Sequence, residues 1–157
     1  MKSSRFSSLN PGSTLCRLIS VRTIRPAPIT VSRSVADLRP GTDIALALAI
    51  SDDPTAEVNR HVATTGLDVP VVTVYLPTGV SNASIAGCNH AYAVAIAIRD
   101  LARHMARTVN PSVLHLFMAA PSGLAVLLGG VWDRVPTTQT YEDLAGNGYE
   151  PAFVIPN

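Results

Sequence analysis

The chain has 157 residues, of which 47% are apolar and only 15% charged, with a formal net charge of +1. This length suits one domain with a single buried core, and the composition excludes a disordered protein. Every apolar run is interrupted before the roughly 18 residues that a membrane helix needs. We therefore expect a cytoplasmic protein without membrane contact. The chain also lacks the basic excess that DNA binding requires, so no DNA binding is expected.

The first 42 residues differ from the rest in charge. Seven of the twelve basic residues lie within the first 39 positions, and the first acidic residue is Asp37. Such a start resembles an organellar transit peptide, but its proline and glycine residues break any long amphipathic helix. We favour an irregular or flexible N-terminal segment over residues 1–42, with one strand at 15–24, and a folded domain over residues 43–157.

Regular patterning begins after residue 43 with three apolar strands. The strands are predicted at 44–50, 69–76 and 113–119. Asp53 is expected to cap a helix that has Pro54 at its first position and ends at Gly66. A loop over 80–89 precedes the longest helix, which ends at Asn110 and Pro111 and has one apolar face. Arg99, Arg103 and Arg107 recur on another face, which we interpret as a solvated surface rather than a nucleic-acid patch.

A short helix runs from Pro121 to Gly129 and Gly130, and two extended pieces follow at 137–144 and 151–155. The element order is then β-α-β-α-β-α-β-β. This order predicts an α/β sandwich with a mostly parallel sheet and an antiparallel edge.

Ligands of open α/β sheets bind beyond the carboxyl ends of the strands. Three such ends carry small or polar residues, at 51–53, 77–79 and 119–123. The last also begins a helix, whose free amides at Ser122, Gly123 and Leu124 suit an anionic group. Each loop alone is explained by turn formation, but three on one rim favour a site for a phosphate-bearing ligand.

Catalytic and metal-binding patterns are absent from the sequence. Ser51, Thr78 and Ser122 lie outside any nucleophile elbow, and no histidine is predicted beside them. We interpret His115 as a buried core residue. For His90, at the start of the long helix, a contact to a ligand and simple solvent exposure remain equal alternatives. The four histidines and two cysteines form no metal-ligand spacing, and no cofactor is expected.

The run from Leu114 to Gly129 and the closing segment resemble the SAVED family. The similarity covers residues 42–156 and the second half of the family pattern, and its signature residues are Ala119, Pro121, Leu124, Ala125, Leu128, Gly129, Tyr141, Tyr149, Glu150 and Pro151. The resemblance implies a Rossmann-like (CARF-like) three-layer sandwich. It also implies a sensor of bacterial anti-phage signalling that binds cyclic oligoadenylate-type messengers between two CARF-like halves and is usually fused to an effector.

The resemblance, together with the strand-end argument, gives an expected ligand-binding set and expected partners. The residues are Ser51, Thr78, Gly79, His90, Ala120, Pro121, Ser122 and Gly123. The partners are a cyclic oligonucleotide, an effector protein or second CARF-like half, and further copies of the chain in a homo-oligomer. We expect a non-catalytic sensor. The alternatives are a ring nuclease-like enzyme and a degenerate half-domain that binds only protein.

Overall fold

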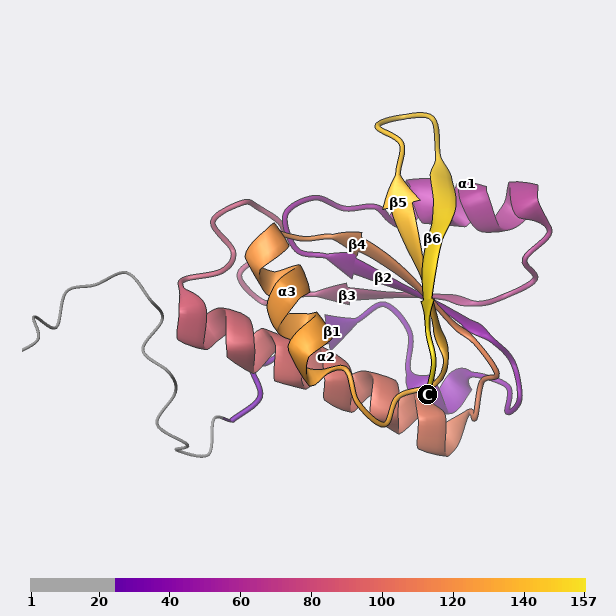
Figure 1. The fold of residues 1–157 in the computed structure, drawn as a ribbon, viewed down its shortest axis with the longest axis horizontal. Coiled ribbons are helices and arrows are strands. Elements are labelled where there is room, and N and C mark those ends of the chain that lie inside the picture. The colour runs from indigo at the N-terminus through magenta and orange to yellow at the C-terminus, as the bar shows by residue number, and fades with distance from the viewer. Residues whose placement is uncertain (1–24) are drawn as a thin grey trace, which may run out of the picture.

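The computed structural model describes residues 25–157, which form one mixed α/β sheet with helices on both faces (Figure 1). Its elements in chain order are β1 (Thr30–Val31), the 3₁₀ helix η1 (Val35–Asp37), β2 (Ile44–Ala49), α1 (Thr55–Thr65), β3 (Val71–Tyr75), α2 (Cys88–Thr108), β4 (Leu114–Ala119), α3 (Ser122–Val131), β5 (Thr138–Asp143) and β6 (Tyr149–Ile155). None of the helices in residues 25–157 is long and apolar enough to cross a membrane.

The sheet has six strands in the order β1-β3-β2-β4-β5-β6. Strands β3, β2, β4 and β5 are parallel, whereas β1 and β6 pair antiparallel at the two edges. The predicted α/β sandwich with a mostly parallel sheet is therefore confirmed. It has antiparallel strands at both edges rather than one, because β1 adds to β3.

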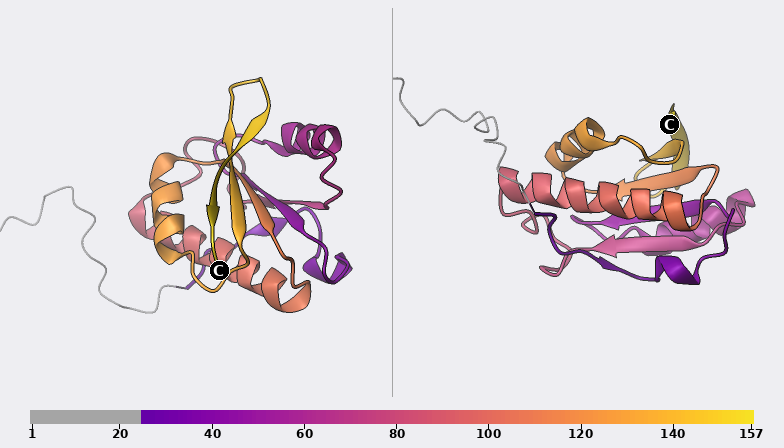
Figure 2. Two further views of the ribbon diagram at one scale, coloured as in Figure 1. Left: turned by 45° about the vertical axis from the view of Figure 1, so that its right-hand side comes forward. Right: turned by 90° about the horizontal axis from the view of Figure 1, so that it is seen from below.

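The two faces of the sheet are covered unequally. On one face the alternate β2 residues Ile44, Leu46 and Leu48 pack in the main core, together with apolar residues of α2 and α3. On the other face Ala45 and Ala47 belong to a smaller cluster that α1 covers. Figure 2 shows α2 and α3 together on one side of the sheet and α1 on the other. This arrangement is the three-layer sandwich expected from the sequence.

The helix boundaries follow local chemistry. The Asp53 carboxylate accepts a hydrogen bond from the Thr55 amide at 3.0 Å and so binds the first amide of α1, but the N-cap position is held by Pro54 and not by Asp53 as predicted. The helix begins at Thr55, one residue later than expected. Gly66 ends it with φ +72°, a left-handed conformation that glycine adopts without steric cost.

Residues 25–42 contribute two elements that the sequence reading did not assign. They are the two-residue strand β1 and the 3₁₀ helix η1. Val35 and Leu38 bury their side chains in the main core. The strand predicted at 15–24 lies outside the described residues.

The arginine face of α2 is partly neutralised by carboxylates. Arg103 pairs with Asp133 at 2.7 Å, and Arg99 pairs with Asp100 at 2.8 Å. Arg107 is exposed. The side chains of Arg99 and Arg103 are only 19% and 21% exposed, so Arg107 alone of the three fits the predicted solvated surface.

Candidate functional site

The parallel strands β2 and β4 end side by side and then lead to opposite faces of the sheet. The chain leaves β2 for α1 and leaves β4 for α3. The amides of Ile50 and Ser51 both donate to the Ala119 carbonyl, at 3.0 and 2.9 Å, which is the last link between the two strands. Beyond it the chains diverge, as at the ligand-binding crevice of open α/β sheets.

The helix α3 presents two unpaired amides at this divergence. Within the described residues, the amides of Ser122 and Gly123 have no hydrogen-bond acceptor. The prediction of a third free amide at Leu124 is wrong, because that amide donates to the Pro121 carbonyl at 2.9 Å. Two exposed amides at the positive end of a helix remain, and such an arrangement suits an anion.

The loop that follows β3 folds back onto the end of β2. The Ser81 amide donates to the Ile50 carbonyl at 3.0 Å, which brings this loop beside Ser51. Thr78 donates through its hydroxyl to the Ser84 carbonyl at 3.4 Å, and the Gly79 amide donates to Leu76 at 2.9 Å. Both groups are thus engaged in the turn itself. The predicted roles of Thr78 and Gly79 as direct ligand contacts stay untested.

A buried serine that the sequence reading passed over holds this loop. The Ser84 side chain is 3% exposed. Its hydroxyl donates to the Gly79 carbonyl at 2.6 Å and accepts from the Ser81 amide at 2.9 Å. No motif marks a loop serine of this kind, because its importance comes from burial in the folded chain. Ser84 fixes the loop that approaches the end of β2.

We expect the substitution Ser84→Ala to destabilise the protein by about 1–3 kcal/mol, because two backbone hydrogen bonds to its buried hydroxyl are lost, each worth about 0.5–1.5 kcal/mol. The exposed Ser112 provides the control Ser112→Ala, which should change stability by less than about 0.5 kcal/mol. Urea unfolding of both variants measures the difference. Equal stability of the two variants would contradict the role assigned to Ser84.

His90 contacts the loop rather than open solvent alone. Its Nδ1 accepts a hydrogen bond from the Ala86 amide at 3.1 Å, and the side chain is half-buried. The imidazole therefore closes the turn that leads into α2. A contact from its other ring nitrogen to a ligand stays a prediction.

The eight predicted residues divide into three groups, all of them near the carboxyl ends of the parallel strands. Ser51 and residues 120–123 lie at the divergence of β2 and β4, Thr78 and Gly79 lie in the loop tied to Ile50, and His90 lies at the start of α2. All eight are at least partly exposed. No histidine is hydrogen-bonded to Ser51, Thr78 or Ser122 within residues 25–157, and no group of three potential metal ligands occurs there.

A cluster of rings on the α1 face of the sheet is the main feature that sequence reasoning missed. Phe117 and Tyr141 stack with ring centroids 4.2 Å apart. The ring of His61, from α1, meets Phe117, Tyr141 and Tyr149 edge-on at 5.3–5.9 Å. These residues are far apart in the sequence, so no local pattern could have grouped them.

His115 joins this cluster as a buried residue. It is 8% exposed, and its Nδ1 lies 2.8 Å from the Tyr141 hydroxyl. The interpretation of His115 as a satisfied core histidine is confirmed. Burial lowers the pKa of His115 and of His61 below the ordinary value, because the charged imidazolium is poorly solvated there. For His115 the carboxylate of Asp43 opposes this effect in part.

These lowered pKa values predict that stability falls in mild acid. The unfolded chain protonates both imidazoles near pH 6.5, whereas the folded chain resists protonation, so stability is full above that pH and is lost as the pH falls below it. Chemical unfolding at pH 7.5 and pH 5.0 measures the loss. It should be smaller in the variants His61→Gln and His115→Gln than in the exposed control His104→Gln. The same loss in all three variants would contradict this assignment.

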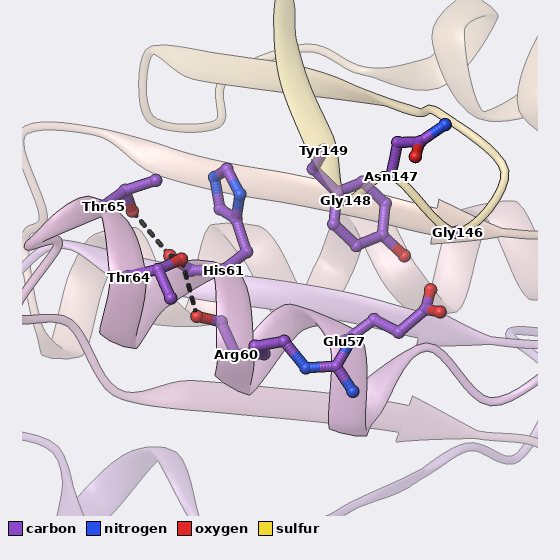
Figure 3. A pocket seen from close by; sticks show the side chains of 9 residues that line it. All are labelled: Glu57, Arg60, His61, Thr64, Thr65, Gly146, Asn147, Gly148 and Tyr149. Atoms are coloured by element: carbon purple, nitrogen blue, oxygen red, sulfur yellow. Dashed lines mark hydrogen bonds between the residues drawn. The ribbon is translucent and has the colours of Figure 1, made fainter.

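Three cavities of about 350–390 Å³ lie away from the eight predicted residues. One of them, of about 350 Å³, lies between α1 and the turn that joins β5 to β6 (Figure 3). The carboxyl ends of β2 and β4 are therefore not part of these three cavities. What they offer is a surface with unpaired amides.

The fold is a Rossmann-like α/β sandwich with a mostly parallel sheet. Residues 22–155 match the model of SAVED, the SMODS-associated and fused to various effectors sensor domain. The chain therefore belongs to the SAVED family. No significant relative appears among curated protein sequences.

Solved structures of SAVED/CARF-domain receptors share the fold. The Acinetobacter baumannii Cap4 receptor with the cyclic trinucleotide 3′3′3′-cAAA superposes with a TM-score of 0.66 at 15% identity, over 85% of this chain and 30% of that one. The same receptor with 2′3′3′-cAAA gives a TM-score of 0.59 at 18% identity, over 74% and 25%. The Moraxella osloensis Cap4 receptor gives 0.56 at 20% identity, over 86% and 27%. The present chain thus spans less than a third of the length of these receptors.

Proposed function

We propose that this chain forms one wall of a binding site for a cyclic oligonucleotide, at the edge where β2 and β4 diverge. The observation that carries the proposal is the pair of unpaired amides at Ser122 and Gly123, next to the end of β2 at Ser51. A cyclic oligonucleotide carries several phosphates, each of which suits such amides. Membership of a family of sensor domains, and the cyclic trinucleotides bound to the similar Cap4 receptors, support this ligand class.

The opposite wall of the site comes from another polypeptide or another domain in this proposal. The surface at the divergence is open, and the chain spans at most 30% of the length of the similar Cap4 receptors. A second CARF-like half, an effector-linked domain or a second copy of the chain would complete the pocket. Ligand held between the two walls then stabilises their association, which is how binding reaches an effector. We propose no catalytic step.

A proline substitution tests the amide contact without disturbing the helix. Ser122 is the first residue of α3, where proline is tolerated, and the preceding Pro121 has the extended ψ of 140° that a following proline requires. Ser122→Pro removes the amide hydrogen, whereas the matched control Ser122→Ala keeps the amide and removes only the hydroxyl. Loss of one charge-assisted hydrogen bond weakens binding about tenfold or more.

The measurement is calorimetric titration of the wild-type chain and both variants with 3′3′3′-cAAA, followed by a check that the ligand remains intact. We expect Ser122→Ala to bind nearly as the wild type does and Ser122→Pro to bind about tenfold more weakly. Equal affinity of the two variants would contradict the proposed hydrogen bond from the Ser122 amide to the ligand. No binding by the wild-type chain to any cyclic tri- or tetra-adenylate would contradict the proposed function. Linear products would identify a ring nuclease instead.

A further inference from the structure

The helix α1 turns a polar face toward the hairpin formed by β5 and β6. Glu57, Arg60, His61, Thr64 and Thr65 follow the spacing of one helix face, and all five line the cavity of about 350 Å³. A helix face that lies against another element is ordinarily apolar, because burial of apolar groups holds the elements together. Here the space between the helix and the hairpin turn is left open and is lined by polar groups.

The charged groups in this cavity are not used by the fold. Glu57 and Arg60 are three residues apart on the helix, a spacing that allows an ion pair. Neither makes one within the described part of the chain. In Figure 3 the Glu57 carboxylate extends toward the phenol of Tyr149, and the Arg60 side chain runs along the helix toward Glu57. Both groups are therefore available to a ligand.

Tyr149 supplies a neutral hydroxyl at the same place. Burial, together with the negative charges of Asp143, Glu57 and Asp52, raises the pKa of Tyr149 to about 12, so the phenol stays protonated. Its hydroxyl has no hydrogen-bond partner among residues 25–157. At the Tyr149 hydroxyl, this negative charge favours a ligand group that donates hydrogen bonds, so a phosphate in the cavity would lie away from this hydroxyl.

The remaining walls combine an aromatic surface with bare backbone. The ring of His61 packs edge-on against the rings of Phe117, Tyr141 and Tyr149. Opposite it lies the turn with Gly146 and Gly148, at φ +92° and +88°, where added β-carbons would meet open space. In Figure 3 the Tyr149 ring lies between His61 and the turn, so a planar group in the cavity would rest against the Tyr149 ring and the backbone of the turn. Because these two glycines carry no side chains, a ligand can approach the backbone of the turn closely.

We propose that this cavity binds one nucleoside monophosphate unit. Its phosphate lies at Arg60, and its ribose hydroxyl lies between Glu57 and Tyr149. Guanidinium groups recognise phosphate, and carboxylates accept hydrogen bonds from ribose hydroxyls. The cavity volume lies within the range of small-ligand sites. The unit is either a free nucleotide or one member of a cyclic oligonucleotide, and in the latter case the inference rests on the proposed function.

The test uses AMP, 2′-deoxy-AMP and adenosine as probes in nuclear magnetic resonance titrations of the whole chain. AMP should shift the resonances of His61 and Gly148. Arg60→Gln should weaken AMP about tenfold and leave adenosine within about twofold. Glu57→Gln should weaken both about tenfold and abolish the preference for AMP over 2′-deoxy-AMP. The matched controls are Glu142→Gln and Arg107→Gln, which remove exposed charges outside the cavity.

Absence of AMP shifts at α1 and the turn in the folded chain would overturn the inference, as would equal AMP affinity in the cavity variants and their controls. Titration with 3′3′3′-cAAA then separates the two sources. Competition with AMP, with weaker binding in Glu57→Gln, assigns the unit to the ring. Simultaneous binding assigns the cavity to a free nucleotide. If AMP binds as expected and the cyclic trinucleotide does not, the proposed function fails while the cavity assignment stands.

Discussion

The substitution Phe117→Ala is expected to destabilise the protein by about 3–5 kcal/mol. Phe117 is fully buried in β4, stacks on Tyr141 and meets His61 and Tyr149 edge-on. Removing the ring creates a cavity at the center of the cluster that joins α1 to the sheet. For a domain of this size the loss corresponds to a fall in Tm of roughly 6–20 °C.

The exposed Phe153 provides a matched control, since it lies on the edge strand β6 and is 61% exposed. Phe153→Ala should change the free energy of unfolding by less than about 0.5 kcal/mol. Unfolding is followed by the fluorescence of Trp132, the one tryptophan of the chain. Where Phe117→Ala does not fold, Phe117→Leu gives a smaller loss that is still measurable. Similar stability for the Phe117 and Phe153 variants would contradict the assigned cluster.

The substitution Trp132→Ala is expected to cost about 3–5 kcal/mol as well, and also to weaken ligand binding. Trp132 follows α3 directly and packs in the main core. Its indole nitrogen donates to the buried Thr138 hydroxyl at 3.0 Å, and that hydroxyl donates to the Pro136 carbonyl at 2.8 Å. The side chain thus fixes the end of α3 to the start of β5.

The variant Trp132→Phe separates packing from hydrogen bonding. It keeps most of the apolar contact and loses one hydrogen bond, so about 1 kcal/mol is expected. Circular dichroism follows unfolding of both variants, because the fluorescent residue is changed. Equal losses in Trp132→Phe and Trp132→Ala would show that the hydrogen bond, and not the packing, holds α3 in place.

Much of the fold follows from local signals in the sequence. The apolar run that starts at Ile44 forms β2, and the apolar spacing after residue 90 forms α2 with Val94, Ala95 and Ile98 fully buried. The cap predicted at Asp53 and the stop predicted at Gly66 place the ends of α1 to within one residue. Each of these signals depends on residues close together in the chain, where propensity and periodicity act.

Features that depend on distant contacts were not visible in the sequence. The strand β1 has only two residues, and its pairing with Tyr75 and Val74 defines it. The ring cluster joins His61 of α1 to rings on the neighbouring strands β4, β5 and β6, which come much later in the chain. At the rim, the expected strand ends meet, but the Leu124 amide proved to be engaged by Pro121. Local patterns located the rim and could not assign the partner of each amide.

The amide resonances of Ser122 and Gly123 give the most direct measurement of the central claim. In a titration of the chain with 3′3′3′-cAAA, we predict that these two resonances shift most strongly, together with that of Ser51. The amide resonances of Gly41 and Asn110, which lie near the amino ends of β2 and β4, should stay in place. Strong shifts confined to the amino ends of β2 and β4, or no shift at Ser122 and Gly123 when the ligand is bound, would contradict the proposed binding site.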